Sequence, residues 1–210
     1  FNDEQVRALF VSFVFAVFLT QSSRAQKSCY WQQEVDYVME IDMDVQTYQY
    51  KGKQKLTYTN NSPDVLKKVY YHLYFNAFQP NSEMDVRVQH SKDPDPRMVT
   101  NTGTSENPVL TSKIALLKPN EIGFIEINSL KQNKELLTYK IDGTILEVYL
   151  NKPIAPGKKA VFEMEFLGQV PNQVRRSGRN NKENVALSMT QWYPKMAVYD
   201  VEGWHAQSYI

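Results

Sequence analysis

A run of recognition-type side chains stands near the end of the chain, at Gln191-Trp192-Tyr193-Pro194. The amide of Gln191 both donates and accepts hydrogen bonds, and the rings of Trp192 and Tyr193 combine an apolar body with a polar edge. Pro194 stiffens the backbone behind them. Such residues bind a ligand by hydrogen bonds and ring contacts, so the run predicts one wall of a binding cleft.

Two other interpretations of these aromatic residues stay open. In the first, Trp192 and Trp204 fill a corner of the hydrophobic core, as aromatic residues near a chain end often do. In the second, Trp192, Tyr193 and Trp204 form a stacking platform, and the chain is a secreted β-sandwich module that binds carbohydrate or a protein partner. Both interpretations predict packing or binding without a chemical reaction.

The sequence lacks the motifs of zinc and nucleophilic catalysis. A zinc peptidase needs His-Glu-x-x-His on a helix, and the chain lacks this motif. The spacing of His72, His90 and His205 fits no shared metal ion, so we predict no metal site. No Gly-x-Ser-x-Gly nucleophile motif is present either. We therefore expect no catalytic residues here. A glycosidase-like enzyme stays open as a third possibility, because its two carboxylates could come from distant strands.

The N-terminal region predicts export. Arg7 precedes an apolar run from Ala8 to Thr20, and small residues suited to cleavage follow, up to Ala25. The run is shorter than the roughly 18 to 20 apolar residues that a membrane-spanning helix needs. Residues 1–25 are therefore predicted to be a helical signal peptide, and the mature chain to be periplasmic or secreted. We expect contact with a membrane only through this peptide, during export.

Cysteine content and charge narrow the remaining classes. The single cysteine, Cys29, follows the predicted cleavage site, so no intramolecular disulfide can form. A formal net charge of +1 gives no electrostatic reason to expect nucleic acid as a partner. The basic cluster at residues 175–179 has no interleaved aromatic residues, and we expect it to be a solvated loop.

Apolar residues recur at every second position in several stretches, which is the pattern of half-buried β-strands. The strongest run alternates apolar residues with five carboxylates: Glu34, Asp36, Glu40, Asp42 and Asp44. Further strands are expected within residues 54–58, 69–75, 123–130, 139–150 and 160–166. Outside the signal peptide, no long stretch has the spacing of an amphipathic helix. The predicted fold class is therefore all-β, with antiparallel strands in a sandwich or in strongly twisted sheets.

Turn residues separate these strands. A turn is expected near Lys51-Gly52, another at residues 60–64, and a hairpin turn at Asp142-Gly143. Pro156-Gly157 predicts a turn before the strand at 160–166. Between Gln79 and Ser112 the periodicity is lost and prolines collect, so most of this stretch is expected to be a long surface loop.

The pattern Thr190-Gln191-x-x-Pro194-x-x-Ala197 resembles a segment of aminopeptidase N-like zinc metallopeptidases, the gluzincin aminopeptidases. By this segment, the N-terminal β-domain of the family enters the active-site cleft. With Gly203-Trp204-His205 after it, the sequence looks most like the exported bacterial branch. Tyr193 stands where the family usually has a carboxylate or amide that meets the substrate's free amine or first side chain.

The resemblance implies that residues 26–210 are the saddle-like N-terminal β-domain of such an enzyme, truncated before the catalytic domain and incomplete at its C-terminal end. It also implies that Gln191 and Tyr193 bind a peptide substrate, from whose N-terminus the parent enzyme removes residues. The zinc of the parent enzyme would be bound outside this fragment, by the missing catalytic domain of the same chain. The fragment alone would not hydrolyse peptides.

Overall fold

Period-two alternation of apolar and polar side chains folds this chain into antiparallel strands, which confirms the predicted fold class. The structure, a computed structural model, describes residues 30–210. The predicted signal peptide at 1–25 and Cys29 lie outside the described residues. Residues Trp31–Ile210 form one unit. Within the described part of the chain, no helix is long and apolar enough to cross a membrane.

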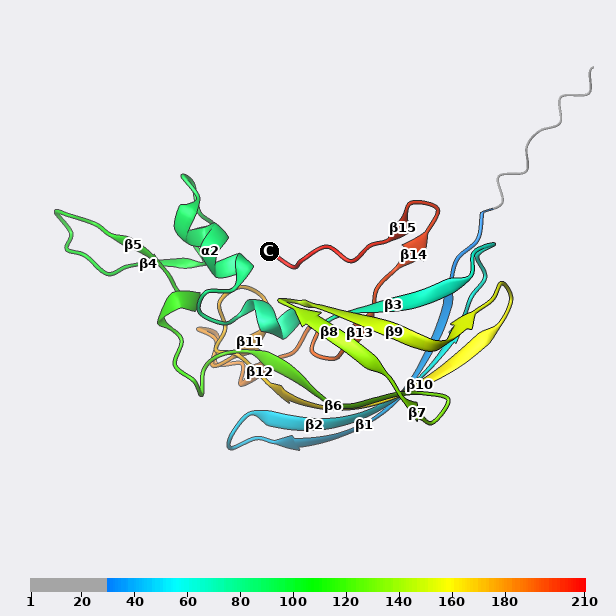
Figure 1. Cartoon of the computed structure of the whole chain (residues 1–210). Coiled ribbons are helices and arrows are strands. Elements are labelled where there is room, and N and C mark those ends of the chain that lie inside the picture. Colours follow the sequence, from blue (N-terminus) through cyan, green and yellow to red (C-terminus); the bar gives the residue numbers. More distant parts are fainter. Residues whose placement is uncertain (1–29) are drawn as a thin grey trace, which may run out of the picture. The chain divides into compact units, whose positions relative to one another are not determined.

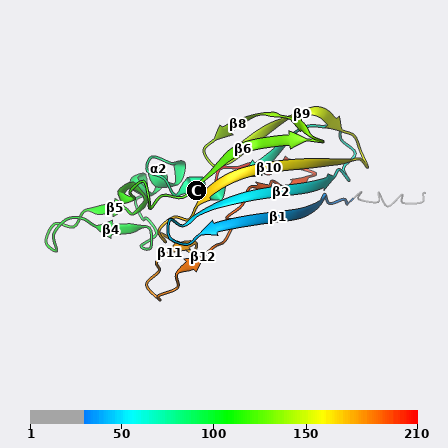
Figure 2. The ribbon, with the colours of Figure 1, turned by 90° about the horizontal axis from the view of Figure 1, so that it is seen from below.

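The larger sheet has five strands, in the order β1-β2-β10-β6-β7, each antiparallel to its neighbours. They are β1 (Glu34–Asp44), β2 (Gln49–Thr59), β10 (Lys159–Gln169), β6 (Phe124–Gln132) and β7 (Glu135–Leu136). Figure 2 shows the four long strands side by side. β1 lies at one edge, and its five carboxylates are all exposed.

The second sheet has four strands, in the order β13-β3-β9-β8. They are β13 (Lys195–Met196), β3 (Leu66–His72), β9 (Ile145–Ile154) and β8 (Thr138–Asp142). β8 and β9 form the hairpin predicted at Asp142-Gly143. Gly143 has a φ of 54° in this turn, a left-handed conformation that glycine adopts without steric cost.

The hydrophobic core contains side chains from both sheets. Alternate residues of β2, β3 and β10 are buried: Leu56, Tyr58, Val69, Tyr71, Phe162 and Phe166. The ring of Tyr71 from the second sheet meets the ring of Phe162 from the larger sheet edge to face, with centroids 6.5 Å apart. Burial of apolar surface, at about 25 cal/mol per Å², is the main force that holds the two sheets together.

Short elements complete the fold. They are η1 (Tyr74–Ala77), α2 (Glu83–His90), β4 (Val99–Asn101), β5 (Leu110–Ser112), η2 (Ile114–Leu116), β11 (Gly178–Arg179), β12 (Leu187–Ser188), β14 (Tyr199–Asp200) and β15 (Gly203–Trp204). Antiparallel pairing joins β4 to β5, β11 to β12 and β14 to β15. Figure 1 shows α2 next to the β4–β5 hairpin.

The turn predicted at Lys51-Gly52 is wrong. The chain turns at residues 45–48 instead, and β2 runs through Gly52. The ring of Phe166 on β10 packs over this glycine: a Cβ atom at Gly52 would lie 2.1 Å from Phe166 Cζ. Glycine inside a strand here marks a close approach of a neighbouring side chain, and not a turn.

The stretch from Gln79 to Ser112 is more ordered than the predicted loop, because it contains α2 and the β4–β5 hairpin. Ser82 caps α2 by accepting a hydrogen bond from the N–H of Asp85. The Asp85 carboxylate in turn accepts the N–H of Asn81 at 2.8 Å. This Ser-x-x-Asp pattern is a helix-start signal of the capping-box kind, and a search for periodicity alone misses it.

Three smaller predictions are also corrected. The strand expected at 69–75 ends at His72, and Tyr74 begins η1. His90, expected in a loop, lies in the last turn of α2. Arg179 of the basic cluster is not solvated: it is 8% exposed, and its guanidinium lies 4.3 Å from the centroid of the Tyr48 ring. Aromatic contact lets this cation remain in a buried position.

Candidate ligand-binding segment

Both predicted site residues, Gln191 and Tyr193, lie in residues 188–197, which we name the edge segment. It begins at the end of β12, which pairs with β11. Near its other end it forms β13, the edge strand of the four-stranded sheet, where Lys195 stands opposite His72 of β3. Pairing with β3 therefore fixes the C-terminal half of the edge segment.

Side chains from β1 and β2 hold the middle of the edge segment. The three bonds are Tyr50 hydroxyl to Trp192 carbonyl, Gln54 amide to Pro194 carbonyl (3.0 Å), and Met196 N–H to Tyr37 hydroxyl (2.8 Å). The edge of a sheet leaves every second residue's backbone groups without a neighbouring strand, and buried groups of this kind need partners. Side chains of the larger sheet supply those partners here.

Burial also sets the protonation of the two tyrosines. Loss of water around Tyr37 and Tyr50 raises the pKa of both phenols above the ordinary value. Both phenols therefore stay neutral at physiological pH. Tyr50 remains able to donate to the carbonyl, and Tyr37 accepts from the backbone N–H without carrying a charge.

On the other side of Gln191, a buried serine holds Thr190. The Oγ of Ser177 accepts the N–H of Thr190 at 3.0 Å. The same hydroxyl donates to the carbonyl of Ser188 at 2.9 Å. Gln191 thus stands between two held residues, with Thr190 bound by Ser177 and Trp192 bound from β2.

Gln191 itself combines an exposed side chain with a strained backbone. Its φ is 55°, which is the left-handed region. This conformation costs roughly 1–2 kcal/mol for a residue that carries a Cβ atom. Within residues 30–210 its side-chain amide makes no hydrogen bond. The amide oxygen and the amide N–H groups are therefore both available to a ligand.

Tyr193 is half-buried and follows Gln191 by two residues. Its ring meets the rings of Tyr37 and Trp192 edge to face, at centroid distances of 5.5 Å and 5.2 Å. Trp192 meets Tyr50 in the same manner at 5.8 Å. Both rings of the edge segment are anchored on the core, so Tyr193 offers a rigid aromatic surface next to Gln191.

Trp204 belongs to a different aromatic group. Its ring contacts Tyr58, Tyr70 and Tyr199, with centroids 6.3, 5.6 and 5.0 Å apart. Within residues 30–210, no ring contact joins Trp204 to Trp192 or Tyr193, whose own rings are inclined by 68° to each other. A stacking platform needs rings that share a plane. The observed arrangement gives no support to a platform made of these three rings.

The histidines bind groups of the chain itself. His72 donates from Nε2 to the carbonyl of His205 at 3.0 Å, and its ring stacks on Tyr74 at 4.9 Å. Burial lowers the pKa of His72. The imidazole of His205 lies 2.8 Å from Asp200 and holds the pKa of that carboxyl below its ordinary value. In the described residues, no group of three His, Cys, Asp or Glu side chains could hold a metal ion.

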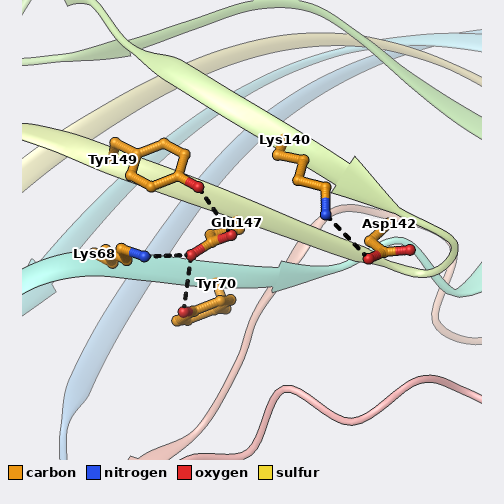
Figure 3. A network of polar contacts seen from close by, with 6 residues as sticks. All are labelled: Lys68, Tyr70, Lys140, Asp142, Glu147 and Tyr149. Atoms are coloured by element: carbon orange, nitrogen blue, oxygen red, sulfur yellow. Dashed lines mark hydrogen bonds and ion pairs between the residues drawn. The ribbon is translucent and has the colours of Figure 1, made fainter.

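A polar network on the second sheet centres on Glu147 of β9 (Figure 3). This carboxylate accepts from Lys68 Nζ (2.6 Å), the Tyr70 hydroxyl (3.2 Å) and the Tyr149 hydroxyl (3.0 Å). Hydrogen bonding to Lys68 holds the pKa of Glu147 below its ordinary value. Lys140 and Asp142 form a separate, exposed pair at 3.3 Å. Donors from its own sheet occupy both oxygens of Glu147, so the network joins β3 to β9.

The supporting residues Tyr37, Tyr50, Gln54 and Ser177 were not singled out from the sequence. In the sequence, only Gln54 gives a signal of this role, because a polar side chain stands there among the apolar core positions of β2. In the structure it is 3% exposed. A polar side chain at a core position must find a hydrogen-bond partner. The sequence alone does not identify that partner as Pro194.

Comparison with known proteins finds similarity in structure only. No known family profile and no curated protein matches the chain. The chain is similar to the solved M1 zinc metallopeptidase from Deinococcus radiodurans, with 12% identity, a TM-score of 0.40, and coverage of 71% of this chain and 24% of that one. A mutant of that enzyme with a bound Tyr-Ser-Ala substrate gives 12% identity, a TM-score of 0.40 and coverage of 72% and 24%.

A two-domain M1 zinc metallopeptidase mutant bound to L-arginine gives 11% identity, a TM-score of 0.43 and coverage of 76% of this chain and 27% of that one. Identities this low restrict the similarity to the fold. The chain spans about a quarter of the length of these solved structures.

Proposed function

We propose that the edge segment forms one wall of a peptide-binding cleft in a zinc aminopeptidase-like protein. Gln191 contacts the N-terminal residue of the peptide, and Tyr193 flanks that residue. The observation that carries the proposal is the state of Gln191, which is left-handed, exposed, and held between Thr190 and Trp192. Strained backbone positions cluster at ligand-binding sites, and the exposed amide of Gln191 is free to meet a ligand there.

The chemistry of the two side chains fits this role. The Oε1 atom of Gln191 is an acceptor for the ammonium group of a peptide N-terminus, and its Nε2 atom is a donor for a peptide carbonyl. The ring of Tyr193 suits an apolar or aromatic first side chain. Because a phenol stands where the resembling family has a carboxylate or amide, attraction to the free amine is weaker here, and ring contact contributes more of the affinity.

Two further parts belong to the proposal. Hydrolysis would be carried out by a zinc-binding catalytic domain outside residues 1–210, and export would be directed by residues 1–25. N-terminal sequencing of the mature protein from a periplasmic or secreted fraction tests the second part. Recovery of a chain that starts after Ala25 supports export, whereas retention of residues 1–25 in a cytoplasmic fraction contradicts it.

Peptide titration tests the proposed site. We expect the chain to bind Tyr-Ser-Ala, the tripeptide of one similar structure, and Gln191→Ala to raise the dissociation constant by about tenfold or more, since a hydrogen bond to a charged group is lost. The matched control is Asn184→Ala, which removes another exposed amide at a left-handed residue, with φ 62°. It should leave binding unchanged.

Calorimetry measures both dissociation constants. An unchanged constant in Gln191→Ala contradicts the role of Gln191. Binding of a neutral oligosaccharide, combined with no binding of the tripeptide, would favour the carbohydrate-binding module instead.

A further inference from the structure

The side chain of Tyr50 has almost no freedom to move. It is 1% exposed, and its ring meets those of Trp192 and Phe166 edge to face, at 5.8 Å and 6.2 Å. Its hydroxyl donates to the carbonyl of Trp192. A close-packed side chain of this kind keeps one position. It therefore fixes the peptide group that follows Trp192, one residue beyond Gln191.

A glycine provides the space for this ring. Gly168 of β10 stands opposite Tyr50 of β2 in the sheet. A Cβ atom at Gly168 would lie 2.1 Å from Tyr50 Cζ and 2.3 Å from its hydroxyl. Any side chain at this position would push the hydroxyl away from the edge segment. Tyr50 and Gly168 thus act together, from two neighbouring strands.

Tyr50 has an effect that the other two supporting side chains of the larger sheet, Gln54 and Tyr37, do not share. Gln54 and Tyr37 bind Pro194 and Met196, which lie in or next to β13 and are also held by its pairing with β3. Within residues 30–210, the bond from the Tyr50 hydroxyl is the one hydrogen bond made by the backbone groups of Trp192. Loss of the Tyr50 hydroxyl would therefore release the C-terminal neighbour of Gln191.

We propose that Tyr50 is a positioning residue for Gln191, acting through the carbonyl of Trp192 in a seat provided by Gly168. This inference rests on the proposed role of Gln191 in peptide binding. Ser177 holds the N-terminal neighbour of Gln191, so the two side chains together present the amide in one place. A group that is already positioned binds its ligand with less loss of conformational entropy.

The first test is independent of any ligand. Tyr50→Phe removes the hydroxyl and keeps the ring, and we expect NMR order parameters of the Gln191 and Trp192 amides to fall from the range of rigid backbone, about 0.85, towards about 0.6. The matched control is Tyr58→Phe, because the Tyr58 hydroxyl is equally buried and has no hydrogen-bond partner in the described residues. Equal order parameters in the two variants would overturn the proposal.

The second test measures coupling to Gln191 through the affinity for Tyr-Ser-Ala. Tyr50→Phe should raise the dissociation constant roughly two- to tenfold, the range set by one hydrogen bond. In a Gln191→Ala background the same substitution should have a clearly smaller effect, because Tyr50 acts on binding mainly through Gln191. A Tyr50→Phe effect of undiminished size in that background would overturn the proposal, since it would show that Tyr50 acts independently of Gln191.

The two proposals fail in different ways. If Gln191→Ala alone leaves the dissociation constant unchanged, the proposed function is wrong, and the order parameters still decide whether Tyr50 holds the edge segment. Gly168→Ala gives an independent check: it should lower the same order parameters as Tyr50→Phe, and the double variant should lower them no further. If a Gly168→Ala protein had order parameters like those of the unsubstituted chain, Gly168 would not be needed to make space for the Tyr50 ring.

Discussion

Gln191 has a backbone conformation that its residue type disfavours. Its backbone is left-handed although it has a Cβ atom, while its side chain has no partner in residues 30–210. The bonds to Thr190 and Trp192 hold it in this state. Stability would favour glycine at this position, whereas the proposed function needs the amide.

Gln191→Gly should therefore stabilise the chain while weakening it as a peptide binder. We expect the free energy of unfolding to rise by about 1 kcal/mol, because glycine adopts the left-handed region without the Cβ clash. Urea denaturation measures this change. Asn184→Gly is the control: asparagine tolerates φ 62° better than glutamine tolerates φ 55°, so its gain should be smaller. An equal or larger gain in the control would contradict the assigned strain.

At the scale of strands, two glycines shape the contact between β2 and β10. Each one receives an aromatic ring from the opposite strand, Phe166 over Gly52 and Tyr50 over Gly168. The rings lie on the core face, where any added atom meets close-packed neighbours. This pairing explains why both glycines occur inside strands and not in turns.

Gly52→Ala should lower the free energy of unfolding by about 1–3 kcal/mol, the usual range for overpacking a core. In a Phe166→Leu background the loss should be clearly smaller, because the ring that meets the new Cβ atom is gone. Gly157→Ala is the control: its φ of 69° strains alanine, and nothing lies within 4 Å, so it should lose the same stability in both backgrounds. Equal losses for Gly52→Ala in both backgrounds would refute the contact.

The elements also show which parts of the fold were predictable. Strand positions followed from local alternation, and the turn at Gly143 followed from its dipeptide. Gly52 was misassigned because its reason lies on another strand, in Phe166. At the candidate site, the sequence offers only the residue types of Gln191 and Tyr193. The backbone of Gln191 and its support from Tyr50 depend on long-range packing, which local patterns do not contain.

Across the whole described unit, His72 links the second sheet to the C-terminal residues through the carbonyl of His205. Burial lowers the pKa of His72, with a smaller contribution from the charge of Lys195. As pH falls, the unfolded chain therefore takes up this proton before the folded chain does. The stability that neutral His72 contributes is complete above its ordinary pKa, about 6.5, and is lost as pH falls through the lowered value.

His72→Gln should flatten the dependence of stability on pH below about 6.5, the ordinary pKa of histidine, because glutamine donates to the same carbonyl without titrating. Thermal or urea unfolding at a series of pH values measures the slope. His90→Gln, which replaces the exposed histidine in the last turn of α2, should keep the slope of the unsubstituted chain. A steep slope that survives in His72→Gln would assign the effect to another group.

The edge strand β1 has a consequence for assembly. Its five carboxylates are exposed, and no strand covers its outer side in the described unit. Two copies that met along this edge would bring rows of like charge together, and like charges placed opposite each other destabilise strand pairing. At physiological ionic strength, dissolved salt screens this repulsion beyond about 8 Å, and this screening length becomes shorter as the salt concentration rises. The acidic edge thus disfavours strand pairing between two copies of the chain, and this effect becomes weaker at high salt concentration.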